Sequence, residues 1–329
     1  MCAQTYPSQP AHTQSVESVV HHHTIPRKDR RQLLHGKSHR HTVNTHISQG
    51  PPGIRNLHGH SQIKKSKRAG IPERHKLPVK QSRGEGHCHS GGNLAIEEKV
   101  NISEAEARHK AGVMQGGFSS PQHCVARWSL AVIVPYRNRE TQIGAFLNHM
   151  HPFLQRQQLN YSIYFVEQEG SAPFNRASLL NVGFKEARKE GPWDCYAFHD
   201  VDLLPENDFH LYHCSPQPRH LAVALSTFKY RIPYYSYFGG GCLMMESHIL
   251  KVNGWSNMYW GWGCEDDDMW NRVTSSDMTV WRYPNPYVRY KMIQHRPAAP
   301  NPESLRSSSI IISVQALSSL TVYQSKHHP

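Results

Sequence analysis

The sequence has no run of 18 or more apolar residues, and its N-terminus lacks the apolar core of a secretory signal. A helix that spans a bilayer needs about 20 apolar residues, so we expect no part of this chain to enter a membrane by itself. The seven cysteines include no Cys-x-x-Cys pair, which disfavours structural zinc and favours disulfides. Patterns typical of serine hydrolases, P-loop proteins and dinucleotide-binding dehydrogenases are also absent, so these classes are poor candidates.

Charge is distributed unevenly along the chain. Residues 1–90 carry 15 Lys and Arg against 4 Asp and Glu, which is +11 of the total +12, together with 13 of the 25 His. The rest of the chain is therefore close to neutral. A basic, His-rich segment without apolar periodicity is typical of a disordered tail. Because this segment also lacks interleaved aromatic residues, we expect no nucleic-acid partner, and a nucleic-acid- or metal-binding module is the less favoured alternative.

From Trp128 onward, apolar runs of strand length alternate with segments of helical spacing. The predicted strands are 130–134 (ended by Pro135), 161–166, 195–198, 221–225 and 242–245, and the predicted helices are 139–157 and 174–188. This alternation predicts an α/β fold with a mainly parallel, twisted sheet flanked by helices. Ligands of such sheets bind at the carboxyl ends of the strands, where residues 135–139 and 200–202 fall.

Asp200-Val201-Asp202 follows a predicted buried strand. In an extended backbone both carboxylates point to the same side, which suits contacts to a divalent metal and a ribose, and such a metal would neutralise a departing diphosphate. If Met292 and His295 join Asp202, the oxygen, nitrogen and sulfur ligands favour manganese. The alternatives are a turn or helix cap for the Asp pair, and core packing for Met292 and His295.

Residues 260–268 read Trp-Gly-Trp-Gly-Cys-Glu-Asp-Asp-Asp. Adjacent carboxylates repel and raise one another's pKa, so they cannot all be buried and charged. A solvated first turn of a helix explains such a run, because acidic side chains suit a helix N-terminus. The functional interpretation has one carboxylate abstract a proton from an acceptor hydroxyl while others hold sugar hydroxyls. Trp262 would then stack on a sugar, within a glycine-rich loop that acts as a lid.

Several segments together resemble the β-1,4-galactosyltransferase family. Their order and spacing match that family, and they occupy residues 135–139, 154–161, 174–177, 200–203, 237–240 and 260–268. The resemblance runs from about Cys124 to Pro302. It implies a GT-A-like domain that transfers galactose from UDP-galactose to the 4-hydroxyl of a terminal N-acetylglucosamine on a glycoprotein or glycolipid, with inversion and with Mn²⁺.

The resemblance also divides the chain and assigns residue roles. The expected parts are a disordered tail (1–90), a linker or stem (91–114), the catalytic domain (115–303) and a divergent C-terminal segment (304–329). Asp266 would be the general base, assisted by Glu265. The metal ligands would be Asp202, Met292 and His295. The UDP contacts would be Pro135, Arg137, Arg139, Phe174, Arg176, Asp200, Val201 and Trp262. The donor or acceptor contacts would be Tyr234, Tyr237, Gly240, Trp262, Gly263, Glu265, Asp266 and Asp267.

Tyr237 stands at the position that distinguishes donors in the family. Members that transfer galactose carry Tyr there, because a phenol crowds the 2-acetamido group of the larger sugar. The resemblance therefore implies galactose as the donor sugar, with N-acetylgalactosamine as the nearest alternative.

The cysteines match the family in part. The resemblance implies a Cys195–Cys214 disulfide and a second bridge from Cys124, for which Cys88 remains as partner. Cys264 stands where the family has glycine, so its side chain could restrict the lid or leave a free thiol. The segment after Pro302 also departs from the family. A catalytically impaired homologue that binds UDP-sugar or glycan is therefore a further alternative.

The family's members are Golgi membrane proteins, which implies the Golgi lumen or membrane for this chain. No signal anchor is visible in the sequence, so membrane association is expected only if an anchor is missing from it. Disulfides and the two sequons, at Asn101 and Asn160, are compatible with such an oxidising compartment.

Overall fold

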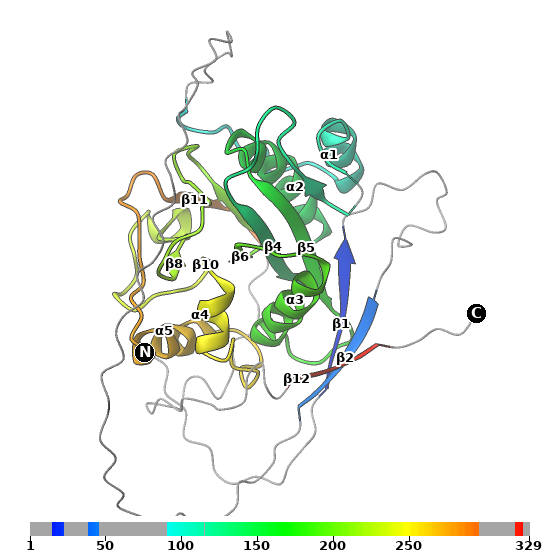
Figure 1. The fold of residues 1–329 in the computed structure, drawn as a ribbon, viewed down its shortest axis with the longest axis vertical. Coiled ribbons are helices and arrows are strands. Elements are labelled where there is room, and N and C mark those ends of the chain that lie inside the picture. Colours follow the sequence, from blue (N-terminus) through cyan, green and yellow to red (C-terminus); the bar gives the residue numbers. More distant parts are fainter. Residues whose placement is uncertain (1–14, 23–38, 46–90, 115, 296–319, 325–329) are drawn as a thin grey trace, which may run out of the picture. The chain divides into compact units, whose positions relative to one another are not determined.

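The computed structural model describes residues 15–22, 39–45, 91–114, 116–295 and 320–324 (Figure 1). Three apolar runs form the centre of the main sheet. β4 (Ser129–Tyr136) pairs in parallel with β5 (Asn160–Gln168) on one side and with β6 (Cys195–His199) on the other. Nearly every residue of these strands is buried, as expected for strands that are covered on both faces.

Antiparallel strands extend this centre on both sides, so the sheet is mixed rather than mainly parallel. Its order is β12-β2-β1-β5-β4-β6-β10-β8, and β3 also pairs with β5. The added strands are β1 (Ser15–His22), β2 (His39–Thr45), β3 (Phe118–Ser119), β8 (Arg219–His220), β10 (Gly241–Met244) and β12 (Leu320–Gln324). A second, three-stranded sheet consists of β7 (Leu203–Pro205), β11 (Arg289–Met292) and β9 (Ala224–Leu225).

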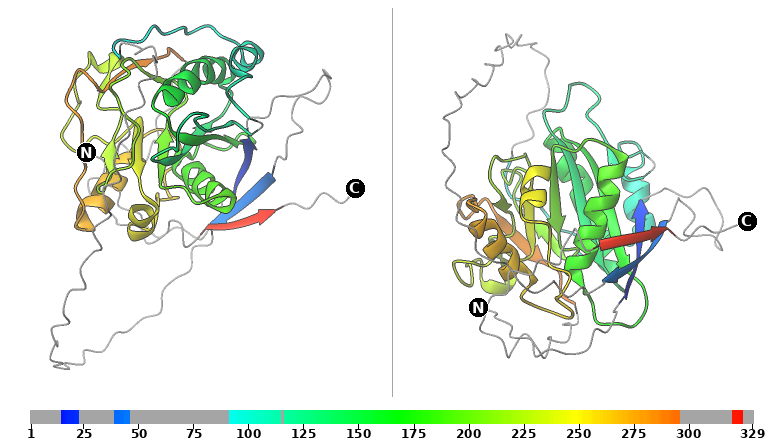
Figure 2. Two further views of the ribbon diagram at one scale, coloured as in Figure 1. Left: turned by 45° about the horizontal axis from the view of Figure 1, so that its top comes forward. Right: turned by 60° about the horizontal axis from the view of Figure 1, so that its bottom comes forward.

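Helices cover both faces of the sheet, which confirms the predicted α/β class (Figure 2). Side chains alternate along β4, so Leu130, Val132 and Val134 pack on one face and Ala131 and Ile133 on the other. The first face is covered by α1 (Ile102–His109) and α2 (Glu140–Arg156). The second is covered by α3 (Arg176–Glu190), α4 (Glu246–Lys251) and α5 (Glu265–Ser275).

Most predicted elements of the domain lie within two residues of the observed ones, with two differences. Pro135 does not end its strand, because pairing of β4 with β6 stops at Ile133 and only β5 pairs beyond it. Proline is tolerated at such an edge. Only the last two residues of the predicted strand 221–225 form a strand, β9. β8 ends just before this range, at His220, and a short 3₁₀ turn, η1 (Ser226–Phe228), follows β9. The break occurs where the Val223 amide donates to the Leu221 carbonyl.

Two segments within the predicted tail, residues 1–90, are strands of the main sheet. β1 pairs with β5 through residues 18–22, and β2 pairs with β1. The valines of β1 (Val16, Val19 and Val20) suit a strand, and β5 offers an edge that needs backbone partners. β12, within the segment expected to diverge, pairs with β2. The rest of the predicted tail, and residues 296–319, lie outside the described residues.

Residues 91–114 are packed against the domain and do not form the predicted linker. The Leu94 amide donates to the Glu206 carbonyl, and Val100 and Ala105 belong to the core cluster on the α2 face. Gly144 of α2 makes this contact possible, since a Cβ there would lie 2.0 Å from the Val100 carbonyl oxygen. Residues 91–114 are thus ordered by their contacts with α2, beside Gly144, which exist only once this helix has folded.

The cysteines follow the expectation in part. Cys195 and Cys214 form the predicted disulfide, with 5.7 Å between their Cα atoms. The predicted bridge from Cys124 to Cys88 is wrong, because Cys124 is a free, exposed thiol; Cys88 lies outside the described residues. Cys264 is disulfide-bonded, so the alternative of a free thiol at this position is also wrong.

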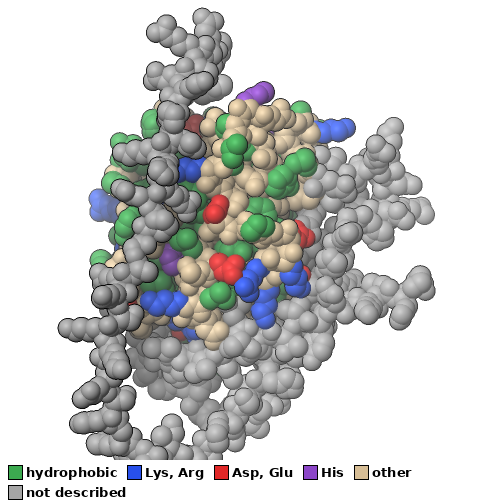
Figure 3. Space-filling view, in the orientation of Figure 1, with side chains coloured by type: hydrophobic (Ala, Val, Ile, Leu, Met, Phe, Trp, Pro, Cys, Tyr) green, Lys and Arg blue, Asp and Glu red, His purple; other side chains and the backbone are tan. Residues whose placement is uncertain are grey.

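Basic and acidic side chains lie next to each other on the face shown in Figure 3. Over α3 and α4 they form ion pairs, Arg188 with Glu246 and Lys189 with Glu186. This mixed surface agrees with the near-neutral composition of the domain. Within the described ranges, no helix is both long enough and apolar enough to cross a membrane.

We expect Gly144→Ala to lower the free energy of unfolding by on the order of 2–4 kcal/mol, because the added methyl group would overlap the Val100 carbonyl. Thermal unfolding of the full chain measures this change. Gly191→Ala is the matched control, since no atom lies within 4 Å of the position its Cβ would take. Equal melting temperatures for both variants would contradict the packing of residues 91–114 on α2.

Candidate active site

Strand pairing brings the predicted metal ligands to one place. β7 begins directly after Asp202 and runs antiparallel to β11, with Leu203 opposite Met292. The Ile293 amide donates to the Asp202 carbonyl at 2.8 Å, and His295 Nε2 lies 2.7 Å from Asp202 Oδ2. Within the described residues, no group of three His, Cys, Asp or Glu side chains gathers to hold a metal. In the predicted ligand set, the Met292 thioether would be the third ligand beside Asp202 and His295, and its strand position opposite Leu203 is compatible with that set.

Two arginines from the end of β4 lie beside this place. An Arg139 Nη2 group is 3.1 Å from His295 Nδ1. Arg137 lies over the Phe174 ring, 5.6 Å from its centroid, and donates to the Ala172 carbonyl at 2.6 Å. A guanidinium over an aromatic ring presents a cation beside a flat apolar surface. This pair could hold a nucleotide base and its phosphates.

Arg176 joins two parts of the site that are far apart in sequence. This first residue of α3 is largely buried, donates to Asp200 at 2.7 Å and pairs with Glu265 at 3.4 Å. Its guanidinium also stacks on the Trp255 ring at 5.6 Å. Burial raises the pKa of Asp200 to about 6, and the charge of Arg176 limits this rise. The Asp-Val-Asp segment and the carboxylates of α5 therefore form one site.

The four consecutive carboxylates begin α5, and they separate into two groups. Asp268 forms an ion pair with Arg272, and both side chains are at most 3% exposed. Asp268 thus belongs to the core, whereas Glu265, Asp266 and Asp267 face the site. Glu265 Oε2 and Asp267 Oδ1 are buried without a hydrogen-bond partner among the described residues. Buried acceptors of this kind call for donors, and sugar hydroxyl groups can supply them.

Asp266 packs against a floor made by a glycine. A Cβ on Gly239 would lie 2.6 Å from Asp266 Oδ2 and 2.9 Å from the Tyr237 hydroxyl, so a side chain here would displace one or both of these groups. Burial raises the pKa of Asp266 to about 8, and the charges of Glu265 and Asp267 add to the rise. The result is a carboxyl group that titrates near neutral pH, which suits a general base.

The loop before α5 has the backbone freedom that its glycines suggest. Gly261 and Gly263 have φ values of 82° and 109°, and Cys264 has φ of 80°. This left-handed region favours glycine, which gives a physical reason for the glycine that the resembling family has in place of Cys264. Trp262 is 69% exposed at the tip of the loop, free to cover a ligand.

Tyrosines surround the carboxylates on the acceptor side. Tyr237 and Tyr234 pack edge to face, with centroids 5.6 Å apart. Burial and the charge of Asp266 raise the pKa of both phenols, so both remain neutral hydrogen-bond donors. Burial raises the pKa of Asp267 as well, although hydrogen bonding with Tyr234 offsets part of the rise.

Three residues predicted to contact ligands, Pro135, Val201 and Gly240, have structural roles. Pro135 and Val201 are buried. Gly240 has φ of 79°, and a Cβ there would meet Leu203 and Ala222 within 2.9 Å. Its carbonyl accepts from the Asp200 amide at 3.0 Å, so Gly240 positions the site through its backbone.

The sequence analysis did not assign Gly239 or Trp255 to the site. The run of three glycines at 239–241 was a visible signal, but a distance to Asp266 cannot be obtained from spacing. Trp255 gave no signal, since its role depends on the position of Arg176.

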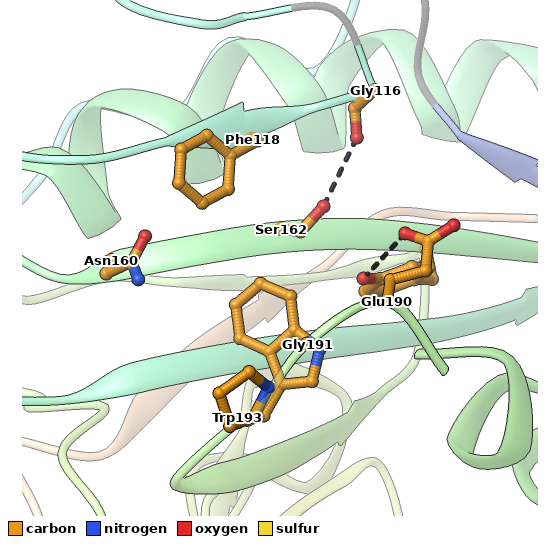
Figure 4. Close-up of a pocket in the computed structure, with 9 residues that line it drawn as sticks. Gly116, Phe118, Asn160, Ser162, Glu190, Gly191 and Trp193 are labelled. Atoms are coloured by element: carbon orange, nitrogen blue, oxygen red, sulfur yellow. Dashed lines mark hydrogen bonds between the residues drawn. The ribbon is translucent and has the colours of Figure 1, made fainter. Parts of the chain in front are cut away.

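A pocket of about 420 Å³ lies at the opposite, amino-terminal ends of the strands. Figure 4 shows Phe118 and Trp193 on its two sides, with Asn160 and Glu190 nearby. Asn160 opens β5, and Trp193 comes two residues before β6. The carboxylates above lie beyond the other ends of these strands, where α/β sheets bind ligands, so this pocket is separate from the candidate site.

Family comparisons agree with this geometry. The N-terminal region of glycosyl transferase group 7 matches residues 85–215, and the N-terminal domain of galactosyltransferase matches residues 219–296. β-1,4-Galactosyltransferase 4 of Cricetulus griseus is 50% identical over 203 residues, which are 61% of this chain and 58% of that protein. Human β-1,4-galactosyltransferase 3 is 48% identical over 204 residues, 62% of this chain and 52% of that protein. The chain thus spans little more than half the length of these relatives.

Solved structures of one relative are also similar. The catalytic domain of Drosophila β1,4-galactosyltransferase 7 in complex with xylobiose is 32% identical, with a TM-score of 0.51, and covers 58% of this chain and 83% of that one. A mutant of the same enzyme with manganese, UDP-Gal and xylobiose is 36% identical, with a TM-score of 0.46, and covers 51% of this chain and 72% of that one.

Fold, carboxylates and matched regions define a glycosyltransferase of group 7. Within this group, the chain belongs to the β-1,4-galactosyltransferase family.

We expect Asp266→Asn to stabilise the fold at pH 8 by on the order of 1–3 kcal/mol. The folded-state pKa of Asp266 is raised to about 8 from 3.8, so the native protein holds a proton that the unfolded chain releases. The free energy of unfolding that this bound proton contributes is fully present below pH 4 and is lost as the pH rises to 8. Asn carries no titrating proton and avoids the loss.

Thermal unfolding of the metal-free full chain at pH 4 and pH 8 tests this expectation. The exposed Asp277 at the end of the same helix provides the control Asp277→Asn, which should change neither melting temperature. An Asp266→Asn increment that is equal at both pH values would contradict the raised pKa.

Proposed function

We propose that this protein transfers galactose from UDP-galactose to the 4-hydroxyl of a terminal N-acetylglucosamine, with inversion at the anomeric carbon and with Mn²⁺. The observation that supports the proposal most is the double contact of Arg176, with Asp200 at 2.7 Å and Glu265 at 3.4 Å. It makes one site from a segment suited to a metal diphosphate and from a set of carboxylates suited to sugar hydroxyls.

The residues that follow strands β4 and β6 bind the donor, UDP-galactose. Asp202, Met292 and His295 would hold Mn²⁺, which when bound neutralises the charge of the departing diphosphate. Arg137, stacked on Phe174, contacts the uridine or its phosphates, and Arg139 beside His295 contacts phosphate. Asp200, held by Arg176, accepts from a ribose hydroxyl.

A carboxylate of α5 accepts the proton in the reaction. Asp266, with its pKa near 8, takes the proton of the acceptor 4-hydroxyl while the oxygen attacks the anomeric carbon from the side opposite the diphosphate. Direct displacement of this kind inverts the configuration. The unpartnered oxygens of Glu265 and Asp267 accept from hydroxyls of donor and acceptor, and so orient them for attack. Trp262 closes over the donor and excludes water.

Tyr237 limits the donor sugar. Its ring packs between Phe228 and Tyr234 and beside Gly239, so it cannot turn away from the floor of the site. A 2-acetamido group at this floor would meet the ring, which supports galactose over N-acetylgalactosamine. The acceptor is a glycan with terminal N-acetylglucosamine, on a glycoprotein or glycolipid. By family, the protein acts in the Golgi, where the Cys195–Cys214 disulfide is stable.

The assay that tests this proposal uses the full chain, Mn²⁺, a free N-acetylglucosamine acceptor and, in parallel, UDP-galactose and UDP-N-acetylgalactosamine. We expect turnover with UDP-galactose and a fall in kcat of about 100-fold or more in Asp266→Asn, as loss of a general base predicts. Asp277→Asn should match the wild type.

Two results of this assay would contradict the proposal in different ways. Turnover with UDP-N-acetylgalactosamine alone would establish the alternative donor. A folded protein that binds UDP and Mn²⁺ but turns over neither donor would be a catalytically impaired homologue.

We expect Gly239→Ala to lower kcat by about 10- to 100-fold, because its methyl group would displace the Asp266 carboxylate that lies 2.6 Å away. Gly241→Ala is the control from the same glycine run, since the nearest atom to its Cβ would be 3.5 Å away. Steady-state kinetics under saturating Mn²⁺ compare the two. Unchanged kcat in Gly239→Ala would contradict the role of this floor in positioning the base.

A further inference from the structure

A chain of hydrogen bonds between buried tyrosines and histidines crosses the core beside the metal ligands. His199 Nε2 lies 2.8 Å from the Tyr212 hydroxyl, which lies 2.5 Å from the Tyr290 hydroxyl. The Tyr290 hydroxyl in turn lies 2.7 Å from His210 Nε2. At its other end, His199 Nδ1 lies 2.8 Å from the Asp200 carbonyl oxygen.

When both imidazoles are neutral, one arrangement of protons satisfies every link of this hydrogen-bond chain. The Asp200 carbonyl is an acceptor, so His199 Nδ1 donates to it and His199 Nε2 must accept from Tyr212. Tyr212 then accepts from Tyr290, and Tyr290 accepts from His210 Nε2. Burial lowers the pKa of His199 to about 4 and lowers that of His210 as well, which favours the neutral form of both imidazoles.

The chain of hydrogen bonds joins the two backbone segments that carry the predicted metal ligands. His199 ends β6 and fixes the peptide between Asp200 and Val201. Tyr290 lies in β11, two residues before Met292, and residues two apart lie on the same face of a strand. The segment that carries Tyr212 is tied to the start of β6, since Cys214 is bonded to Cys195.

We propose that Tyr212 and Tyr290 are positioning residues that hold Asp202 and Met292 at the spacing required for a divalent cation. The inference rests on the proposed function, because it takes Asp202, Met292 and His295 as the metal ligands. Neither tyrosine is among the predicted metal ligands. The pairing of β7 with β11 fixes Leu203 opposite Met292, and the hydrogen-bond chain fixes the other side of the same turn, at the Asp200 carbonyl.

A positioning role predicts an effect on metal affinity, whereas ordinary core packing predicts an effect on stability alone. Loss of a buried hydroxyl from a Tyr–His pair lowers stability wherever the pair lies. Loss of a positioning hydroxyl also lowers metal affinity, typically about 10-fold or more for groups that orient ligands. A matched pair elsewhere in the same core separates the two effects.

The test is a titration of the full-length protein with Mn²⁺ alone, in which electron paramagnetic resonance measures the free ion. Asp202→Asn identifies the site, since the binding lost in that variant is binding at Asp202. We expect Tyr212→Phe and Tyr290→Phe to raise the Kd of this site about 10-fold. At saturating Mn²⁺, kcat should stay close to the wild-type value.

Tyr161→Phe is the matched control. The Tyr161 hydroxyl is bonded to His151 at 2.9 Å, is fully buried, and lies at the opposite end of β5. This variant should lose a similar amount of stability in thermal unfolding without a change in Mn²⁺ affinity. Tyr290→Phe leaves the Tyr212–His199 bond intact and serves as the milder variant if Tyr212→Phe does not fold.

Two results would overturn the inference. If folded Tyr212→Phe and Tyr290→Phe bind Mn²⁺ as tightly as Tyr161→Phe does, the chain of hydrogen bonds only packs the core. If the wild type and Asp202→Asn bind Mn²⁺ equally, the ligand set is wrong and the inference fails with it; galactose transfer by the wild type would show whether the proposed function survives.

Discussion

The site depends on a buried guanidinium that neutralises carboxylates from two distant segments. Asp200, Glu265 and Asp266 gather within a low-dielectric region. Burial and the neighbouring carboxylates raise the pKa of Asp200 and of Asp266, and the repulsion between these charges opposes folding. Arg176 contributes the compensating charge, and the Trp255 ring and the start of α3 hold it in place. Arginine suits this position better than lysine, since its planar fork reaches two carboxylates at once. Without that cation, the loop after β6 and the first turn of α5 would repel each other.

The charge of Arg176 offsets only part of the rise in the pKa of Asp266, so this carboxyl group keeps a raised pKa in the folded protein. Asp268, two residues further along α5, forms an ion pair with Arg272 and belongs to the core. Asp266 faces Gly239 and Tyr237, without a cation bonded to it in the described residues. The four consecutive carboxylates therefore divide into one that belongs to the core, Asp268, and three that face the candidate site, according to the side of the helix on which each lies.

Sequence reasoning predicted the α/β class, the central strands and the place of the site, because buried strands and helices leave strong local patterns at 130–134, 161–166 and 174–188. It failed where order comes from distant partners. Residues 91–114 are polar and short, yet Gly144 gives Val100 a place to pack. Asp268 could not be separated from Asp266 without the position of Arg272, and the Tyr212–Tyr290 contact joins residues that share no motif. Cys124 shows the limit of resemblance, since its expected bridge does not form.

The outer strands have a consequence for how the chain reaches its native state during synthesis. β1 pairs with β5 across more than a hundred residues, and β12 pairs with β2 across most of the chain. Loops of such length form slowly. β1 and β2 precede β5 in the chain, whereas β12 follows it by about 150 residues, so the edge of β2 that β12 covers is the last of these edges to be paired. An exposed edge can recruit another chain. Chaperone demand should therefore be set by this last pairing step, long after the core around β4 has formed.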